Sequence, residues 1–144
     1  MEKTVAVIGA GNGGQALAAH LASMGFKVRI FERDPHKAGL LDSSRKIVLS
    51  GALDLCGDIE FVSTDIARVI KGAEIIMVAT TATAHRSIAA QTAKILEDGQ
   101  VILLNPGRTC GALEFRNALE SNGLSKKVYV AEAQTLVYAC RLTR

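Results

Sequence analysis

Short apolar runs alternate along the chain with longer segments in which apolar residues recur every three or four positions. The short runs predict buried strands at residues 4–8, 27–31, 74–79, 101–104 and 128–131. The longer segments predict helices at residues 14–24, 66–70, 83–96 and 112–119. Repeated strand-then-helix order is typical of an α/β fold with helical crossovers. We therefore expect one domain over residues 1–144, with a doubly wound, mostly parallel sheet between two helical layers.

The segment after the second strand starts with a separate signal, and the pattern is less regular from residue 45 to residue 62. Asp34-Pro35 predicts the start of a turn or short helix, because Pro is tolerated in a first helical turn. The apolar runs at 47–49, 53–55 and 59–62 are separated by Ser50-Gly51 and Gly57-Asp58. Short strands or a hairpin, followed by a third strand of the main sheet, fit this spacing.

Composition supports a buried aliphatic core. Hydrophobic residues make up 49% of the 144 residues but aromatic residues only 4%, which suits a parallel sheet covered on both faces. The net charge of +3 suits an anionic ligand or an ordinary solvated surface. Basic residues form no stripe with interleaved aromatics, so we expect no nucleic-acid partner.

Cysteine usage and hydropathy indicate the compartment. Cys56, Cys110 and Cys140 are odd in number and widely spaced, so we expect buried free thiols rather than disulfides or a metal site. No signal peptide or membrane span is predicted, and we expect a cytoplasmic protein without a membrane partner.

A glycine-rich loop lies between the first predicted strand and the first predicted helix. It matches G-x-G-x-x-G and consists of Gly9, Ala10, Gly11, Asn12, Gly13 and Gly14. In this strand–loop–helix context the first glycine permits the turn, the second lets a pyrophosphate approach, and the third lets the helix pack on the strand. The helix amides then face the phosphates. The loop therefore predicts a Rossmann dinucleotide-binding fold, with these six residues contacting the cofactor.

Two charged residues at the end of the second strand bear on the choice of cofactor. An acidic residue about 20 residues after the glycines is expected to bind the ribose hydroxyls of NAD, and Glu32 stands there. Arg33 beside it leaves NADP open, since a guanidinium accepts an extra phosphate. We expect both residues to contact the cofactor and NAD to be preferred over NADP.

The loops after later strands are expected at the same edge of the sheet. Thr80 and Asn105 are candidate ligands for the ribose or carboxamide of a nicotinamide, and Arg108 is a candidate for a substrate carboxylate. Ordinary caps, turns and surface charges explain the same residues. His85 is interpreted as a packing or capping residue, and no catalytic residue is assigned.

The chain resembles the amino-terminal domain of the octopine/nopaline (opine) dehydrogenase family. The resemblance rests on residues 7–16, on 105–109 with 111–115, and on 131–135 with 138–141; Cys110 stands where glycine is expected. It implies NADH- or NADPH-dependent joining of an amino acid to a 2-oxo acid, a reaction at a CH–NH bond. It also implies a second, helical domain carrying the catalytic His and most of the substrate site, which we expect to be absent from this chain.

Two alternatives remain open at this point. The chain fits a stand-alone NAD(H)-binding regulatory module without catalysis. It also fits the cofactor domain of a glycerol-3-phosphate or ketopantoate-reductase-like dehydrogenase, although residues 105–109 and 134–141 argue against that class. An apolar face left bare would favour a homodimer.

Overall fold

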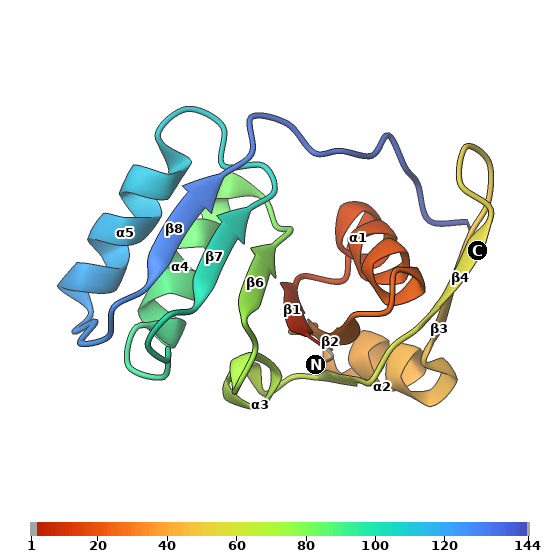
Figure 1. Ribbon diagram of the computed structural model, residues 1–144, viewed down its shortest axis with the longest axis horizontal. Coiled ribbons are helices and arrows are strands. Elements are labelled where there is room, and N and C mark those ends of the chain that lie inside the picture. The colour runs from red at the N-terminus through yellow and green to blue at the C-terminus, as the bar shows by residue number, and fades with distance from the viewer. Residues whose placement is uncertain (1–2, 144) are drawn as a thin grey trace.

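A six-stranded parallel sheet forms the centre of the molecule (Figure 1). The computed structural model describes residues 3–143. The strands are β1 Thr4–Ile8, β2 Lys27–Phe31, β5 Phe61–Ser63, β6 Ile75–Val78, β7 Val101–Leu104 and β8 Tyr129–Glu132. Their order is β5-β2-β1-β6-β7-β8, and every neighbouring pair is parallel. Successive strands are added on one side of β1 up to β5 and on its other side from β6 to β8, so the strand order reverses between β1 and β6. This confirms the predicted doubly wound topology.

Helices cover both faces of this sheet. They are α1 Asn12–Ser23, α2 Pro35–Ser44, α3 Ile66–Ile70, α4 Ala82–Thr92 and α5 Gly111–Ser121. One hydrophobic cluster joins α1 and α2 to one face, and a second joins α3, α4 and α5 to the other. The three-layer arrangement expected from the sequence is therefore present.

A two-stranded antiparallel hairpin lies outside the main sheet. It consists of β3 Lys46–Leu49 and β4 Leu55–Asp58. The predicted second strand at 53–55 was placed too early, because the Asp54 carboxylate accepts the amide hydrogen of Gly51 at 3.0 Å and keeps this segment in the turn. A Cβ on Gly57 would lie 2.5 Å from the backbone of Ala19. The hairpin is therefore packed directly onto α1.

Local hydrogen bonds explain where two helices differ from prediction. The turn or short helix at Asp34-Pro35 is a ten-residue helix, because the Asp34 carboxylate accepts the amide hydrogens of His36 and Lys37. The bond from Lys37, more than that from His36, lowers the pKa of Asp34. α4 ends at Thr92 rather than residue 96. The Thr92 hydroxyl donates to the Ile88 carbonyl at 2.8 Å, and the chain continues as a turn.

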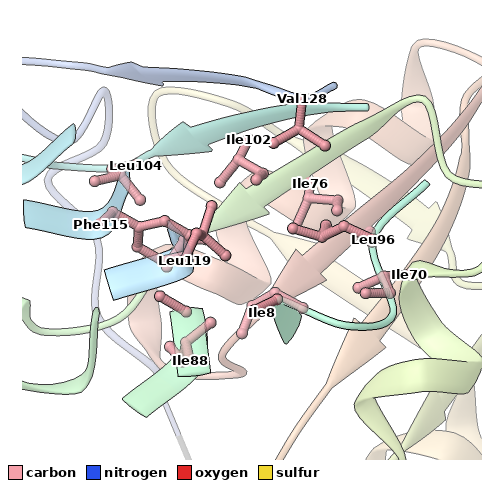
Figure 2. Close-up of a cluster of buried hydrophobic side chains, with 14 of the residues drawn as sticks. Ile8, Ile70, Ile76, Ile88, Leu96, Ile102, Leu104, Phe115, Leu119 and Val128 are labelled. Atoms are coloured by element: carbon pink, nitrogen blue, oxygen red, sulfur yellow. The ribbon is translucent and has the colours of Figure 1, made fainter. Parts of the chain in front are cut away.

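The larger of the two hydrophobic clusters is built from side chains on one face of the strands. Alternate residues of β1, β6 and β7 point toward α4 and α5 and meet side chains from both helices (Figure 2). The labelled members from these elements are Ile8, Ile76, Ile88, Ile102, Leu104, Phe115 and Leu119. Phe115 is the largest fully buried side chain among residues 3–143, and together with Leu119 it packs α5 onto the sheet.

Replacing Phe115 with Ala should lower the free energy of unfolding by about 3–5 kcal/mol, through lost burial and the cavity left behind. Leu113→Ala in the same helix is the matched control, because Leu113 is 70% exposed. Urea denaturation followed by circular dichroism measures both variants. Equal midpoints for the two would contradict the assignment of Phe115 to the core.

Candidate cofactor-binding site

A cavity of about 320 Å³ opens at the carboxyl ends of β1, β6 and β7. Its walls are residues 11–13 at the start of α1, residues 79–82 after β6, the loop after β7, and Leu136. Five predicted site residues line it together, namely Gly11, Asn12, Gly13, Thr80 and Asn105. Arg108 lines it as well. Parallel strands bring these distant segments to one edge of the sheet.

Two glycines of the loop are required by the close packing around them. Gly9 has φ +104°, and a Cβ there would lie 2.9 Å from the Thr80 methyl group. A Cβ on Gly14 would overlap the carbonyl oxygen of Gly9. These positions, with Ala10 between Gly9 and Gly11, hold β1 against α1 from outside the cavity.

Gly11 has different surroundings from Gly9 and Gly14. Its φ of −75° is open to any residue, and nothing lies within 4 Å of the position of a Cβ. It is the N-cap of α1, where no side chain caps the helix and no acidic residue stands in the first turn. The amides of that turn carry partial positive charge toward the cavity. The missing side chain therefore leaves room beside an uncapped helix start that attracts anions.

The segment after β8, residues 133–143, runs over α1 toward the hairpin (Figure 1). A Cβ on Gly13 would lie 2.6 Å from a methyl carbon of Leu136. The Tyr138 hydroxyl hydrogen-bonds His20 Nδ1 at 2.6 Å, and Asn12 Oδ1 accepts the amide hydrogen of Leu142 at 3.0 Å. The Asn12 side chain therefore holds this segment. Leu136 was missed in the sequence, where nothing local distinguishes it.

Glu32 and Arg33 lie outside the cavity, at the carboxyl end of β2. Glu32 is half-buried, and its Oε1 accepts the Asp34 amide hydrogen at 2.9 Å. Arg33 is exposed. Because β2 is next to β1, these residues flank the glycine loop on the side opposite to β6.

Asn105 is buried at the cavity wall. Its side-chain Nδ2 donates to the Leu103 carbonyl at 2.9 Å and to the Met77 sulfur at 3.4 Å. The two hydrogens of this amide point back into the protein. Its carbonyl oxygen is the atom left to accept a bond from a ligand.

His85 is a residue of α4 whose ring contacts Phe115 of α5, and it does not line the cavity. It is 2% exposed, its ring meets that of Phe115 edge to face, and its Nε2 has no hydrogen-bond partner among residues 3–143. Burial lowers the pKa of His85, and the charge of Glu132 opposes this in part. The position fits the packing interpretation.

The three cysteines are free as expected, but the expectation that they are buried was wrong for all three. Cys56 and Cys110 are exposed and Cys140 is half-buried, and all three are free. Cys56 lies on the outer face of the hairpin, and Cys110 is the N-cap of α5 in a left-handed conformation with φ 60°.

Within the described range, no group of three His, Cys, Asp or Glu side chains could hold a metal ion. None of the helices between residues 3 and 143 has the length and hydropathy to cross a bilayer.

The topology, the glycine loop and the cavity define a dinucleotide-binding domain of the Rossmann type. The family model for the NAD-dependent glycerol-3-phosphate dehydrogenase N-terminus matches residues 4–109, and the chain belongs to this family. The expected cofactor class, NAD, is confirmed at the level of this family.

The chain is also 38% identical to an opine dehydrogenase of Arthrobacter sp. (strain 1C) over 144 residues, 99% of the chain and 40% of that relative. This confirms the resemblance given by the sequence motifs. A glycerol-3-phosphate dehydrogenase [NAD(P)+] of Moorella thermoacetica is 34% identical over 72% of the chain and 31% of its own length. The chain thus spans about two fifths or less of these two curated relatives.

Solved structures share the fold. Octopine dehydrogenase in complex with NADH and agmatine has a TM-score of 0.84 at 21% identity, covering 99% of this chain and 37% of that one. Octopine dehydrogenase with NADH and pyruvate gives 0.85 at 22% identity, covering 99% and 38%.

The buried His85 should make folding stability depend on pH. The pKa of His85 in the folded protein lies below the ordinary value of 6.5. As the pH falls below 6.5, the imidazole therefore binds a proton more readily in the unfolded chain than in the folded one. The free energy of unfolding should therefore fall between about pH 7 and pH 5, and His85→Leu should reduce the slope. The exposed His36, changed to Gln, should retain it. Urea midpoints across this range measure the effect, and an unchanged slope in His85→Leu would refute it.

Proposed function

We propose that the chain binds NAD(H) with the pyrophosphate against the first turn of α1. The observation that carries this proposal is the open space over Gly11, beside a helix start that no side chain caps. A diphosphate supplies the anion that such amides favour. Bound NADH in the octopine dehydrogenase structures supports the same cofactor for this fold.

The two halves of the dinucleotide then lie on opposite sides of the loop. The adenosine half lies over β2, where the Glu32 carboxylate accepts hydrogen bonds from ribose hydroxyls and repels the extra phosphate of NADP. The nicotinamide half lies over β6 and β7, within reach of Thr80 and the Asn105 carbonyl oxygen. Arg33, exposed beside Glu32, lies against the adenine or outside the ribose.

We further propose that the chain serves an opine-type oxidoreductase that joins an amino acid to a 2-oxo acid. The glycerol-3-phosphate dehydrogenase model stops at residue 109, whereas the match to the Arthrobacter opine dehydrogenase runs over 99% of the chain. Bound NADH supplies the hydride that reduces the imine carbon between the two substrates. This chain orients the nicotinamide and excludes water from one face of it, and Arg108 holds a substrate carboxylate at the cavity wall. No residue of this chain is proposed as the proton donor.

Gly11→Val should abolish most NADH affinity, by about 100-fold or more, because the side chain fills the space for the phosphates. The fold should survive, since φ is ordinary at this position. Calorimetry with NADH, NADPH and ADP-ribose measures binding, and thermal melts check folding. Gly39→Val in α2 is the matched control, because a Cβ there also meets open space, away from the cavity. Unchanged NADH affinity in Gly11→Val would overturn the site, and tighter NADPH binding would overturn the preference for NAD.

Binding of the second substrate distinguishes an opine-type reaction from glycerol-3-phosphate oxidoreduction. With NADH bound, pyruvate should bind measurably to the wild-type chain and less tightly to Arg108→Ala, with an expected loss of about tenfold for one charge-assisted contact. Dihydroxyacetone phosphate should bind less tightly than pyruvate. Calorimetry of the NADH complex gives both values. Preference for the phosphate ester would instead support the glycerol-3-phosphate dehydrogenase class.

A further inference from the structure

Glu132 ends β8 and reaches the loop that follows the neighbouring strand. In the parallel register it is the partner of Leu104, the last residue of β7. The loop from Asn105 to Cys110 starts directly after Leu104, and α5 begins at Gly111. Glu132 is exposed as a residue, so burial in the core does not hold its side chain against this loop.

The Glu132 carboxylate occupies the start of α5. Its Oε2 accepts the amide hydrogen of Ala112 at 2.6 Å. The helix lacks a cap of its own, because Cys110 at the N-cap makes no side-chain hydrogen bond. A carboxylate at this end accepts a hydrogen bond from an otherwise unpaired amide, and its negative charge interacts favourably with the helix dipole. Glu132 therefore does from another strand what an N-cap side chain normally does.

Two glycines make room for the same carboxylate. A Cβ on Gly107 would overlap the Cβ of Glu132 and lie 2.5 Å from its Oε2, and a Cβ on Gly111 would lie 3.0 Å from Oε2. The Gly107 amide also donates to the carbonyl of Ala133, the residue after Glu132, at 3.1 Å. The loop is thus fitted around the Glu132 side chain at both of its ends.

The opposite side of this loop forms a wall of the cavity, through Asn105, Pro106 and Arg108. We propose that Glu132 is a positioning residue for the nicotinamide half of the cofactor site. It acts through the loop after β7, which it holds at the start of α5, and it does not itself touch the cofactor. This inference rests on the proposed binding of NAD(H). It states that the Glu132 carboxylate sets the orientation of the loop after β7.

Comparing NADH with ADP-ribose tests this role, because ADP-ribose lacks the nicotinamide half. Glu132→Ala should weaken NADH binding about tenfold, the effect of losing a helix cap, and change ADP-ribose binding less than about twofold. Glu132→Gln keeps an acceptor oxygen and should recover part of the NADH affinity. Amide hydrogen exchange at Ala112 should speed up in Glu132→Ala. Glu114→Gln is the matched control, because Glu114 stands in the same first turn but its carboxylate pairs with Arg86 at 3.2 Å.

The outcomes separate this inference from the proposed function. Selective loss of NADH affinity in Glu132→Ala, but not in Glu114→Gln, supports the positioning role. Equal losses for NADH and ADP-ribose, or equal effects of the two substitutions, would overturn it in favour of a general effect on folding or on helix charge. Unchanged NADH binding in a folded Glu132→Ala would overturn it as well. A wild-type chain that binds neither molecule would overturn the proposed function itself.

Discussion

The site depends on one constraint, which is that the amides in the first turn of α1 receive no side-chain cap from residues 3–143. No side chain caps this helix, and the parallel sheet brings the ends of β1, β6 and β7 to the same edge. Gly9 and Gly14 hold the helix close to the strand, while Gly11 keeps the space beside the amides empty. A helix terminus with uncompensated partial charge is costly in isolation, and an anionic ligand compensates it.

Most of the fold was predictable because it follows from local pattern. Aliphatic runs and helical spacing identified five strands of the main sheet and the doubly wound fold, and the glycine loop indicated the edge where we propose that a ligand binds. Boundaries were less certain where a side chain bonds to the backbone, as Asp54 does in the hairpin turn and Thr92 at the end of α4. Such bonds depend on geometry that hydrophobic periodicity does not encode.

The cavity was only partly predictable, for a different reason. Gly11, Thr80 and Asn105 come within three residues of a strand's end, so their place at the sheet edge could be inferred from sequence order. Leu136 and Glu132 act on segments far away in the sequence, and only the tertiary arrangement shows which loop each one contacts. The direction of a side chain was equally hidden, since the amide hydrogens of Asn105 point into the protein. Family resemblance marked residues 131–135 and 138–141 as characteristic without giving their physical role.

The contact between Gly57 and the backbone of Ala19 gives the hairpin two parts with different tolerance to change. Its base, where β4 lies on α1, is coupled to the helix whose first turn faces the cavity. Its tip at residues 50–54 is exposed over most of its length, and such tips accept insertions readily. A fluorescent label or affinity tag placed at the tip would therefore leave the glycine loop undisturbed. A larger residue at Gly57 in the base would instead push on α1 and displace the glycine loop at its start.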